Sequence, residues 1–188
     1  MEFRDLKQQY ECLKTDIDKQ ITEVISSASF ISGKQVSELE QMLADYVGIK
    51  HCISCANGTD AISIALWAWG IGCKDAVFVP DFTFFSSGEC PATSGATPIF
   101  VDVLPSTYNL DPIKLEKAIK KVLYEGKYTP KAVIAVDLFG LPADYDRIRP
   151  ICEKYNLLLL EDAAQGFGGT LHNKRACSFG NISTTSFF

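Results

Sequence analysis

The feature that most constrains the fold of this chain is a set of short, unbroken apolar runs separated by segments with helical spacing. The runs are Val77-Phe-Val79, Val133-Ile-Ala-Val136 and Leu157-Leu-Leu-Leu160. Hydrophobicity that is continuous rather than alternating indicates strands covered on both faces, as in a mostly parallel sheet between two layers of helices. The sequence therefore predicts an α/β fold.

Helices and strands are expected to alternate along most of the chain. The predicted helices are Leu6–Ser27, Gln35–Tyr46, Thr59–Trp69, Ser86–Ser94, Ile113–Val122 and Asp144–Tyr155. The predicted strands are His51–Ala56, Ala76–Pro80, Pro98–Val103, Ala132–Val136, Leu157–Glu161 and Asn181–Phe188. No internal repeat or linker interrupts this pattern, so we expect one α/β domain. No turn or polar tail follows the last predicted strand, and we interpret the sequence as part of a longer protein.

The composition excludes several classes of function. A chain of 188 residues with 47% hydrophobic and 22% charged residues is typical of an ordinary globular protein. Its net charge of -5 gives no positive surface for nucleic acid or an anionic membrane, so a bound phosphate would be held locally by amides or single side chains. Because there is neither an apolar run of transmembrane length nor a signal-peptide core, we expect a cytoplasmic location.

The seven cysteines favour reduced, buried thiols over a disulfide framework, because they are odd in number and scattered through apolar segments. Cys52 and Cys55 form a C-x-x-C pair, but in the predicted strand their side chains would point to opposite faces. With only His51 and His172 as histidines, we do not expect a metal site.

Ligands of open α/β sheets bind beyond the carboxyl ends of the strands, so candidate binding residues are expected there. Asn57-Gly58-Thr59-Asp60 leads from a predicted strand into a helix. Free amides and the dipole of such a helix start favour a phosphate group, and Thr59 adds a hydroxyl. An ordinary capped helix start explains the same residues and is favoured if the segment is taken alone. The segment contains neither the glycine motif of dinucleotide-binding folds nor a Walker P-loop, so the sequence gives no support for a dinucleotide-binding or NTPase function.

Three aromatic residues follow the next strand, in Asp81-Phe-Thr-Phe-Phe-Ser-Ser87. Such side chains could stack on a planar ring or pack in the core, and both interpretations carry about equal weight. In either case at least one of Phe82, Phe84 and Phe85 should be buried in the core.

Two acids, Glu161 and Asp162, directly follow the run of leucines, and Gln165 comes shortly after. A carboxylate at the buried end of a sheet is costly unless it is paired. A protonated pyridine nitrogen would pair with it, and Gln165 could bind a phenolic oxygen, although Asp162 could instead cap the next segment. A phosphate site, a stacking aromatic and a buried anion together match pyridoxal 5'-phosphate (PLP).

With these residues, the chain resembles the DegT/StrS family of PLP-dependent nucleotide-sugar aminotransferases, which have fold type I. The matching segments occur in the family's order over nearly the whole chain. They are Asp5-Leu-Lys-Gln-Gln-Tyr10, Cys55-Ala-Asn-Gly-Thr-Asp-Ala61, Thr83-Phe84, Gly95-Ala-Thr-Pro98, Thr107-Tyr-Asn-Leu-Asp-Pro112, Phe139-Gly140, Pro142-Ala-Asp144, Glu161-Asp-Ala-Ala-Gln165, Ser178-Phe-Gly180 and Ser186-Phe-Phe188.

The resemblance implies a role for each matching residue. Gly58, Thr59 and Asp60 would bind the PLP phosphate, with a further contact from Ser186. Phe84 would stack on the ring, Asp162 would pair with the ring nitrogen, and Gln165 would contact the ring hydroxyl. Residues 1–188 would form the N-terminal part of the PLP-binding large domain, without the C-terminal small domain.

The family's cofactor-holding lysine follows the Ser-Phe motif, and no lysine of this chain occupies that position. Lys174, in the predicted turn His172–Arg175, is interpreted as a solvated charge. The chain alone is therefore expected to be inactive.

The family's substrates are glutamate and a nucleotide-linked keto-sugar, and its members form homodimers. The motifs are most similar to the branch that acts on UDP-linked 3-keto or 4-keto N-acetylhexosamines in surface-glycan synthesis. A sugar dehydratase with histidine in place of the lysine, and a non-catalytic binding or regulatory domain, remain as alternatives.

Overall fold

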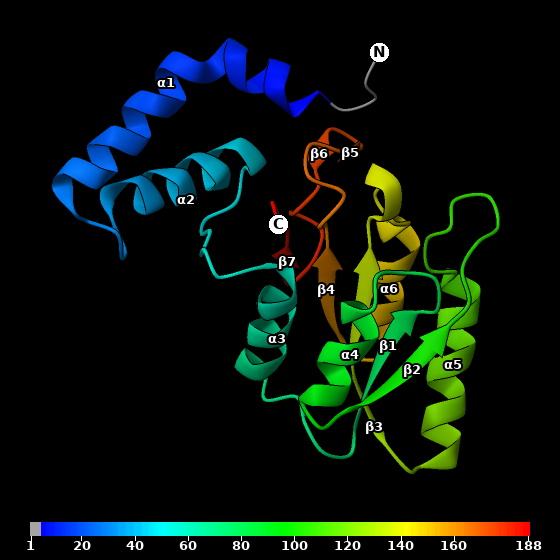
Figure 1. Cartoon of the computed structure of the whole chain (residues 1–188). Coiled ribbons are helices and arrows are strands. Elements are labelled where there is room, and N and C mark those ends of the chain that lie inside the picture. Colours follow the sequence, from blue (N-terminus) through cyan, green and yellow to red (C-terminus); the bar gives the residue numbers. More distant parts are fainter. Residues whose placement is uncertain (1–4) are drawn as a thin grey trace. The chain divides into compact units, whose positions relative to one another are not determined.

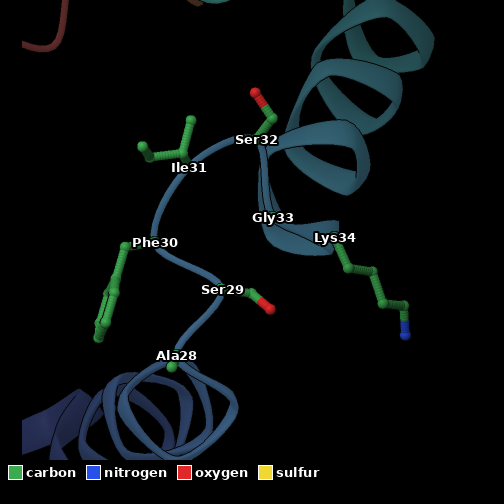
Figure 2. A pocket seen from close by; sticks show the side chains of 7 residues that line it. All are labelled: Ala28, Ser29, Phe30, Ile31, Ser32, Gly33 and Lys34. Atoms are coloured by element: carbon green, nitrogen blue, oxygen red, sulfur yellow. The ribbon is translucent and has the colours of Figure 1, made fainter.

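The structure is a computed structural model that describes residues 5–188. The described residues form two compact units: residues 5–45 with His51–Ser54, and Tyr46–Lys50 with Cys55–Phe188. The helices α1 (Leu6–Ser27) and α2 (Lys34–Val47) belong mainly to the first unit (Figure 1). Asp5 caps α1 by accepting a hydrogen bond from the amide of Gln8 over 2.9 Å. The segment Ala28–Lys34, which connects the two helices, lines a pocket (Figure 2).

The second unit contains a five-stranded sheet with the order β2-β1-β3-β4-β7. All neighbouring strands are parallel, which confirms the predicted fold class. The strands are β1 (Asp75–Pro80), β2 (Thr97–Val101), β3 (Thr129–Val136), β4 (Leu158–Asp162) and β7 (Ile182–Thr184). A separate antiparallel hairpin pairs β5 (Thr170–Leu171) with β6 (Lys174–Arg175). Lys174, predicted to lie in the turn His172–Arg175, belongs to β6 and is exposed, and the turn itself covers only His172 and Asn173.

Helices cover both faces of the sheet, as the continuous apolar runs predicted. On one face α3 (Gly58–Ala68) and α4 (Ser86–Thr93) pack against Val77 and Val79. On the other face α5 (Pro112–Glu125) and α6 (Tyr145–Lys154) pack against Phe78 (Figure 1). Because side chains alternate along a strand, β1 contributes to both apolar clusters.

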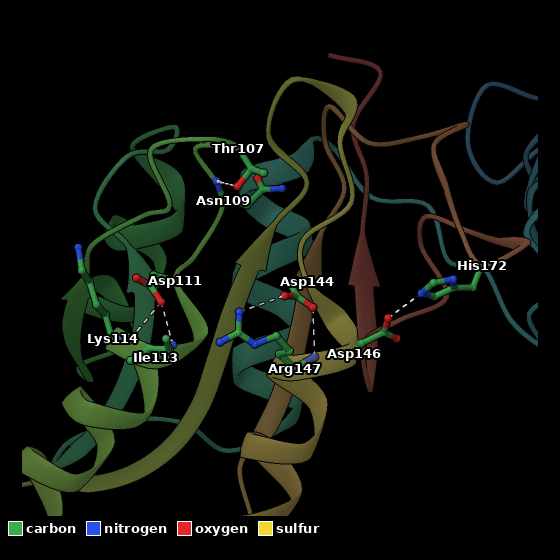
Figure 3. A network of polar contacts seen from close by, with 9 residues as sticks. All are labelled: Thr107, Asn109, Asp111, Ile113, Lys114, Asp144, Asp146, Arg147 and His172. Atoms are coloured by element: carbon green, nitrogen blue, oxygen red, sulfur yellow. Dashed lines mark hydrogen bonds and ion pairs between the residues drawn. The ribbon is translucent and has the colours of Figure 1, made fainter.

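Local polar contacts fix where the helices of the second unit begin (Figure 3). Asp111 accepts hydrogen bonds from the amides of Ile113 and Lys114 at the start of α5. Asp144 does the same for Arg147 at the start of α6. These aspartates satisfy amides that have no partner inside the helix. In the same region His172 lies 2.6 Å from the Asp146 carboxylate.

The predicted strand His51–Ala56 does not form. These residues have no regular secondary structure, and Ile53 is 86% exposed. A strand requires a hydrogen-bonded neighbour, and no strand among residues 5–188 pairs with this segment. The last strand is also shorter than predicted, since β7 covers only Ile182–Thr184 rather than Asn181–Phe188.

The expectation of buried thiols holds for only part of the cysteines. Cys90, Cys152 and Cys177 are buried, but Cys12, Cys55 and Cys73 are exposed. An apolar sequence context therefore does not by itself place a cysteine in the core, just as it does not make His51–Ala56 a strand. Among the described helices, none is long and apolar enough to cross a membrane.

Candidate functional site

The candidate site lies at the carboxyl edge of the parallel sheet. From β1 the chain first adds β2 on one side and later adds β3, β4 and β7 on the other side. The direction in which strands are added therefore reverses between β1 and β3. Open α/β sheets bind ligands at such switch points. The segments that follow β1, β3, β4 and β7 meet at this edge.

Asp162, at the end of β4, is a buried carboxylate with an exposure of 5%. Ser87 Oγ donates to its Oδ2 over 3.3 Å, and the amide of Ala164 donates to its Oδ1 over 3.2 Å. No ion pair involves Asp162 within the described part of the chain. Burial raises the pKa of the carboxyl group, and the hydrogen bonds from Ala164 and Ser87 lower it only in part. A cation bound beside Asp162 would therefore be strongly stabilised.

Ser86 and Ser87, neighbours in the first turn of α4, connect Asp162 with the start of α3. Ser87 Oγ, which donates to Asp162, also lies 2.9 Å from Thr83 Oγ1. The Oγ of the neighbouring residue Ser86 lies 2.6 Å from Oγ1 of Thr59. Asp162 and Thr59 thus contact adjacent residues of the first turn of α4. Ser86 and Ser87 were not predicted from the sequence, because two serines at a helix start are common and do not by themselves indicate a site.

The first turn of α3 offers two open amides. Asn57 caps the helix: its Oδ1 accepts from the amide of Asp60 over 2.9 Å, and its carbonyl accepts from the amide of Ala61 over 3.0 Å. Within residues 5–188, the amides of Gly58 and Thr59 have no acceptor. Open amides at a helix N-terminus can bind an anion. Asp60 also contacts Asn57 through its carboxylate, at 3.0 Å.

Gly58 lies directly against Ser186, which comes from the segment after β7. A Cβ at position 58 would be 2.9 Å from Cβ of Ser186 and 3.3 Å from its Oγ. Only glycine fits at this approach without a shift. The structure therefore brings together Gly58, Thr59 and Ser186, which lie far apart in the sequence.

Gln165 has one end of its side chain fixed. Its Oε1 accepts a hydrogen bond from the amide of Phe139 over 2.8 Å, although the residue as a whole is exposed. Because the amide of Phe139 must donate to the oxygen, the NH₂ group of Gln165 remains as a donor for another partner.

Phe84 lies in the turn between β1 and α4 and is 71% exposed. Its carbonyl accepts a hydrogen bond from the amide of Ser87 over 3.2 Å. Phe84 is therefore one turn of backbone away from Ser87, the residue whose hydroxyl contacts Asp162. Phe82 and Phe85 are 49% and 74% exposed, so the expectation that one of the three is in the core is wrong. β1 ends at Pro80, as predicted, and all three rings lie in the exposed turn that follows it.

Glu161, the other acid of the pair, faces away from this site. Neighbouring side chains of a strand point to opposite faces, and Glu161 accepts hydrogen bonds from the segment before β7 and from β7 itself. The donors are the amides of Cys177, Phe179 and Gly180 and the hydroxyl of Ser183, at 2.5 to 3.2 Å.

The five-stranded parallel sheet covered by helices on both faces is the α/β fold seen in solved aminotransferase structures. The chain belongs to the DegT/DnrJ/EryC1/StrS aminotransferase family, which matches residues 11–188.

Individual relatives agree with this membership. The chain is 47% identical to the UDP-2-acetamido-2-deoxy-3-oxo-D-glucuronate aminotransferase of Pseudomonas aeruginosa, over 100% of the chain and 50% of that protein. A DegT DnrJ EryC1 StrS aminotransferase from Brucella abortus has a TM-score of 0.98 at 45% identity, covering 100% of this chain and 50% of that one. NtdA from Bacillus subtilis, solved with bound cofactor PMP, has a TM-score of 0.77 at 36% identity over 87% of this chain and 36% of that one. The chain thus spans about half the length of the relatives it matches.

Proposed function

We propose that the protein to which these residues belong is a PLP-dependent aminotransferase that moves an amino group from glutamate to a UDP-linked keto-sugar. The sugar would be a 3-keto or 4-keto N-acetylhexosamine derivative used in surface-glycan biosynthesis. Support comes from the family membership and from the relative in Pseudomonas aeruginosa, whose name describes a UDP-linked 3-oxo sugar acid. Residues 1–188 would supply the N-terminal part of the cofactor-binding large domain.

The observation that carries this proposal is the state of Asp162. Its carboxylate is buried, receives hydrogen bonds only from Ser87 and Ala164, and has no cationic partner within residues 5–188. A protonated pyridine nitrogen would provide the missing positive charge. The residues present therefore fit PLP. When bound, PLP withdraws electrons from the carbon that carries the amino group.

Each remaining side chain has a definite task in this proposal. Asp162 would keep the proton on the ring nitrogen, and its pKa would fall when the cation binds. The open amides of Gly58 and Thr59, with the Ser186 hydroxyl, would hold the phosphate. The NH₂ group of Gln165 would donate to the ring hydroxyl oxygen, and the exposed ring of Phe84 would cover one face of the cofactor.

The test is a titration of the 188-residue chain with PLP, followed by absorbance. We expect reversible binding, weakened about tenfold or more by Asp162→Ala, because a hydrogen bond to a charged group contributes roughly 1.5–3 kcal/mol. Asp146→Ala, which removes an exposed acid of α6, should leave the affinity unchanged. Equal affinities of the wild-type chain and the Asp162→Ala variant would show that the site is misassigned.

Borohydride reduction of the same mixture tests the absence of a covalent link. Every lysine of the described residues is exposed, and none lies in the segments 57–60, 81–87, 137–140 or 162–165 that form the site. We therefore expect peptide mapping to find no stable cofactor adduct on a defined lysine. One reproducible adduct would contradict the proposal that this part of the protein binds PLP only noncovalently.

A further inference from the structure

A second buried acid, Asp137, lies next to the candidate site and has no part in the proposed cofactor contacts. It directly follows β3 and has an exposure of 0%. Its Oδ1 accepts hydrogen bonds from the amide of Ala143 over 3.0 Å and from the hydroxyl of Tyr145 over 2.7 Å. Its Oδ2 is shielded from solvent and has no donor among residues 5–188. A buried oxygen without a partner is rare and costly, so it requires an explanation.

The neighbour of Asp137 is another acid, Glu161. In the pairing of β3 with β4, Ala135 lies opposite Glu161, and Asp137 comes two residues after Ala135, directly beyond the end of β3. Side chains two residues apart share a face, so Asp137 and Glu161 point to the same side of the sheet. Glu161 raises the pKa of Asp137 by its negative charge and by a hydrogen bond between the two side chains. An ionised carboxylate can only accept hydrogen bonds, so a hydrogen bond between the two acids requires one of them to be protonated.

The other contacts decide which of the two acids carries the proton. Glu161 already accepts four hydrogen bonds, three of them from backbone amides, which stabilises its ionised form. Asp137 has one oxygen with no donor at all. Burial raises the pKa of Asp137 to about 7, and the negative charge of Glu161 adds to the rise against the hydrogen bonds from Tyr145 and Ala143. Burial also raises the pKa of Tyr145, which keeps its hydroxyl a neutral donor.

We propose that Asp137 and Glu161 share one proton, which Asp137 Oδ2 donates to the Glu161 carboxylate, and that this pair positions Asp162 and Gln165. The second half of the proposal rests on the proposed function, since it concerns the residues assigned to the cofactor ring. The first half concerns the chain alone.

Three contacts connect the pair to the site. The amide of Asp137 donates to the carbonyl of Asp162 over 2.9 Å. The amide of Phe139, two residues further on, holds Gln165 Oε1. Gly166 packs so closely on Asp137 that a Cβ there would lie 2.5 Å from the Asp137 Cβ. Loss of the shared proton would place two negative charges side by side between the ends of β3 and β4, and the repulsion would shift both attached residues.

A carbon-detected NMR titration of the side-chain carboxyl groups in the 188-residue chain tests the shared proton. We expect the Asp137 carboxyl carbon to titrate with a midpoint near pH 7, in line with its raised pKa. The side-chain NH₂ signals of Gln165 should move with the same midpoint, which a merely structural role of Asp137 would not produce. An Asp137 carbon that titrates below about pH 5, as an ordinary aspartate does, would overturn the proposal.

Asp137→Asn is the informative variant. Asparagine presents an oxygen to Ala143 and Tyr145 and an NH₂ donor to Glu161, so it imitates the protonated acid and should fold. In this variant the Gln165 signals should not respond near pH 7. Asp137→Ala, which offers Glu161 no donor, should be less stable at every pH. If the Gln165 signals of Asp137→Asn still moved with the wild-type midpoint, the positioning role would be refuted.

The stability of the two proteins gives a second measurement. The pKa of Asp137 is about 7 in the folded chain and near 3.8 when unperturbed, so the folded state holds an extra proton between these values. The wild-type chain should therefore lose stability as pH rises through this window. Asp162 also has a raised pKa, so it too makes the free energy of unfolding fall as pH rises. Asp137→Asn should show a smaller slope than the wild type, and equal slopes would overturn the shared proton. Failure of the chain to bind PLP would refute the proposed function but would not affect these readouts.

Discussion

Ser87 Oγ is the side-chain donor that reaches the Asp162 carboxylate in the described part of the chain. We predict that Ser87→Ala raises the pKa of Asp162 further and destabilises the fold by about 1–3 kcal/mol, because a buried carboxylate oxygen loses its partner. The carboxyl carbon shift of Asp162, followed against pH, measures the first effect, and denaturant unfolding measures the second.

Ser94→Ala is the matched control for this substitution. Ser94 Oγ is buried and has no hydrogen-bond partner among residues 5–188, so its removal should cost little and leave Asp162 unchanged. A Ser87→Ala variant that behaves like Ser94→Ala would mean that Ser87 does not support Asp162.

At the scale of elements, the start of α3 combines a cap with the proposed phosphate site. Asn57→Ala removes the side-chain acceptor for the amide of Asp60. We predict a loss of about 1 kcal/mol in the free energy of unfolding, which is typical of a lost N-cap, together with weaker PLP binding. Both follow because the freed helix end no longer holds the amides of Gly58 and Thr59 in place.

Asp144→Ala provides the comparison, because Asp144 caps α6 through the amide of Arg147 and does not touch the site. It should lose similar stability without any change in PLP affinity. If both variants weakened binding equally, the start of α3 would have no special role in holding the phosphate.

At the scale of the whole molecule, α1 suggests how two copies associate. This 22-residue helix buries none of its residues, and Leu6, Leu13 and Ile21 are among its exposed apolar side chains. The family resemblance implies homodimers, and an apolar helix surface of this kind is typical of an interface. We predict that the chain self-associates, and that Leu13→Glu with Ile21→Glu shifts it to a monomer in sedimentation velocity. Tyr124→Glu, an equally drastic change at an exposed residue of α5, should not; a wild-type chain that stays monomeric at high concentration would disprove the prediction.

The sequence alone determined the alternation of helices and strands, because periodicity and caps act locally. The predicted helices Leu6–Ser27 and Ser86–Ser94 agree with α1 and α4 to within one residue at each end. The covered sheet also followed directly from apolar runs such as Val133–Val136. The acid Asp162 and the turn at Gly58 were found because each stands at the end of a predicted element.

Only the tertiary structure decided which contacts join these elements. The segment His51–Ala56 has strand-like residues but lacks a neighbouring strand, and a single sequence does not show that lack. Glu161 and Asp162 look equivalent in the sequence, yet the alternation of side chains sends them to opposite faces. The contact of Ser87 with Asp162 and the proposed shared proton of Asp137 and Glu161 involve residues far apart in the chain. Local pattern carries no information on such pairs, because they arise only when distant strands pack side by side.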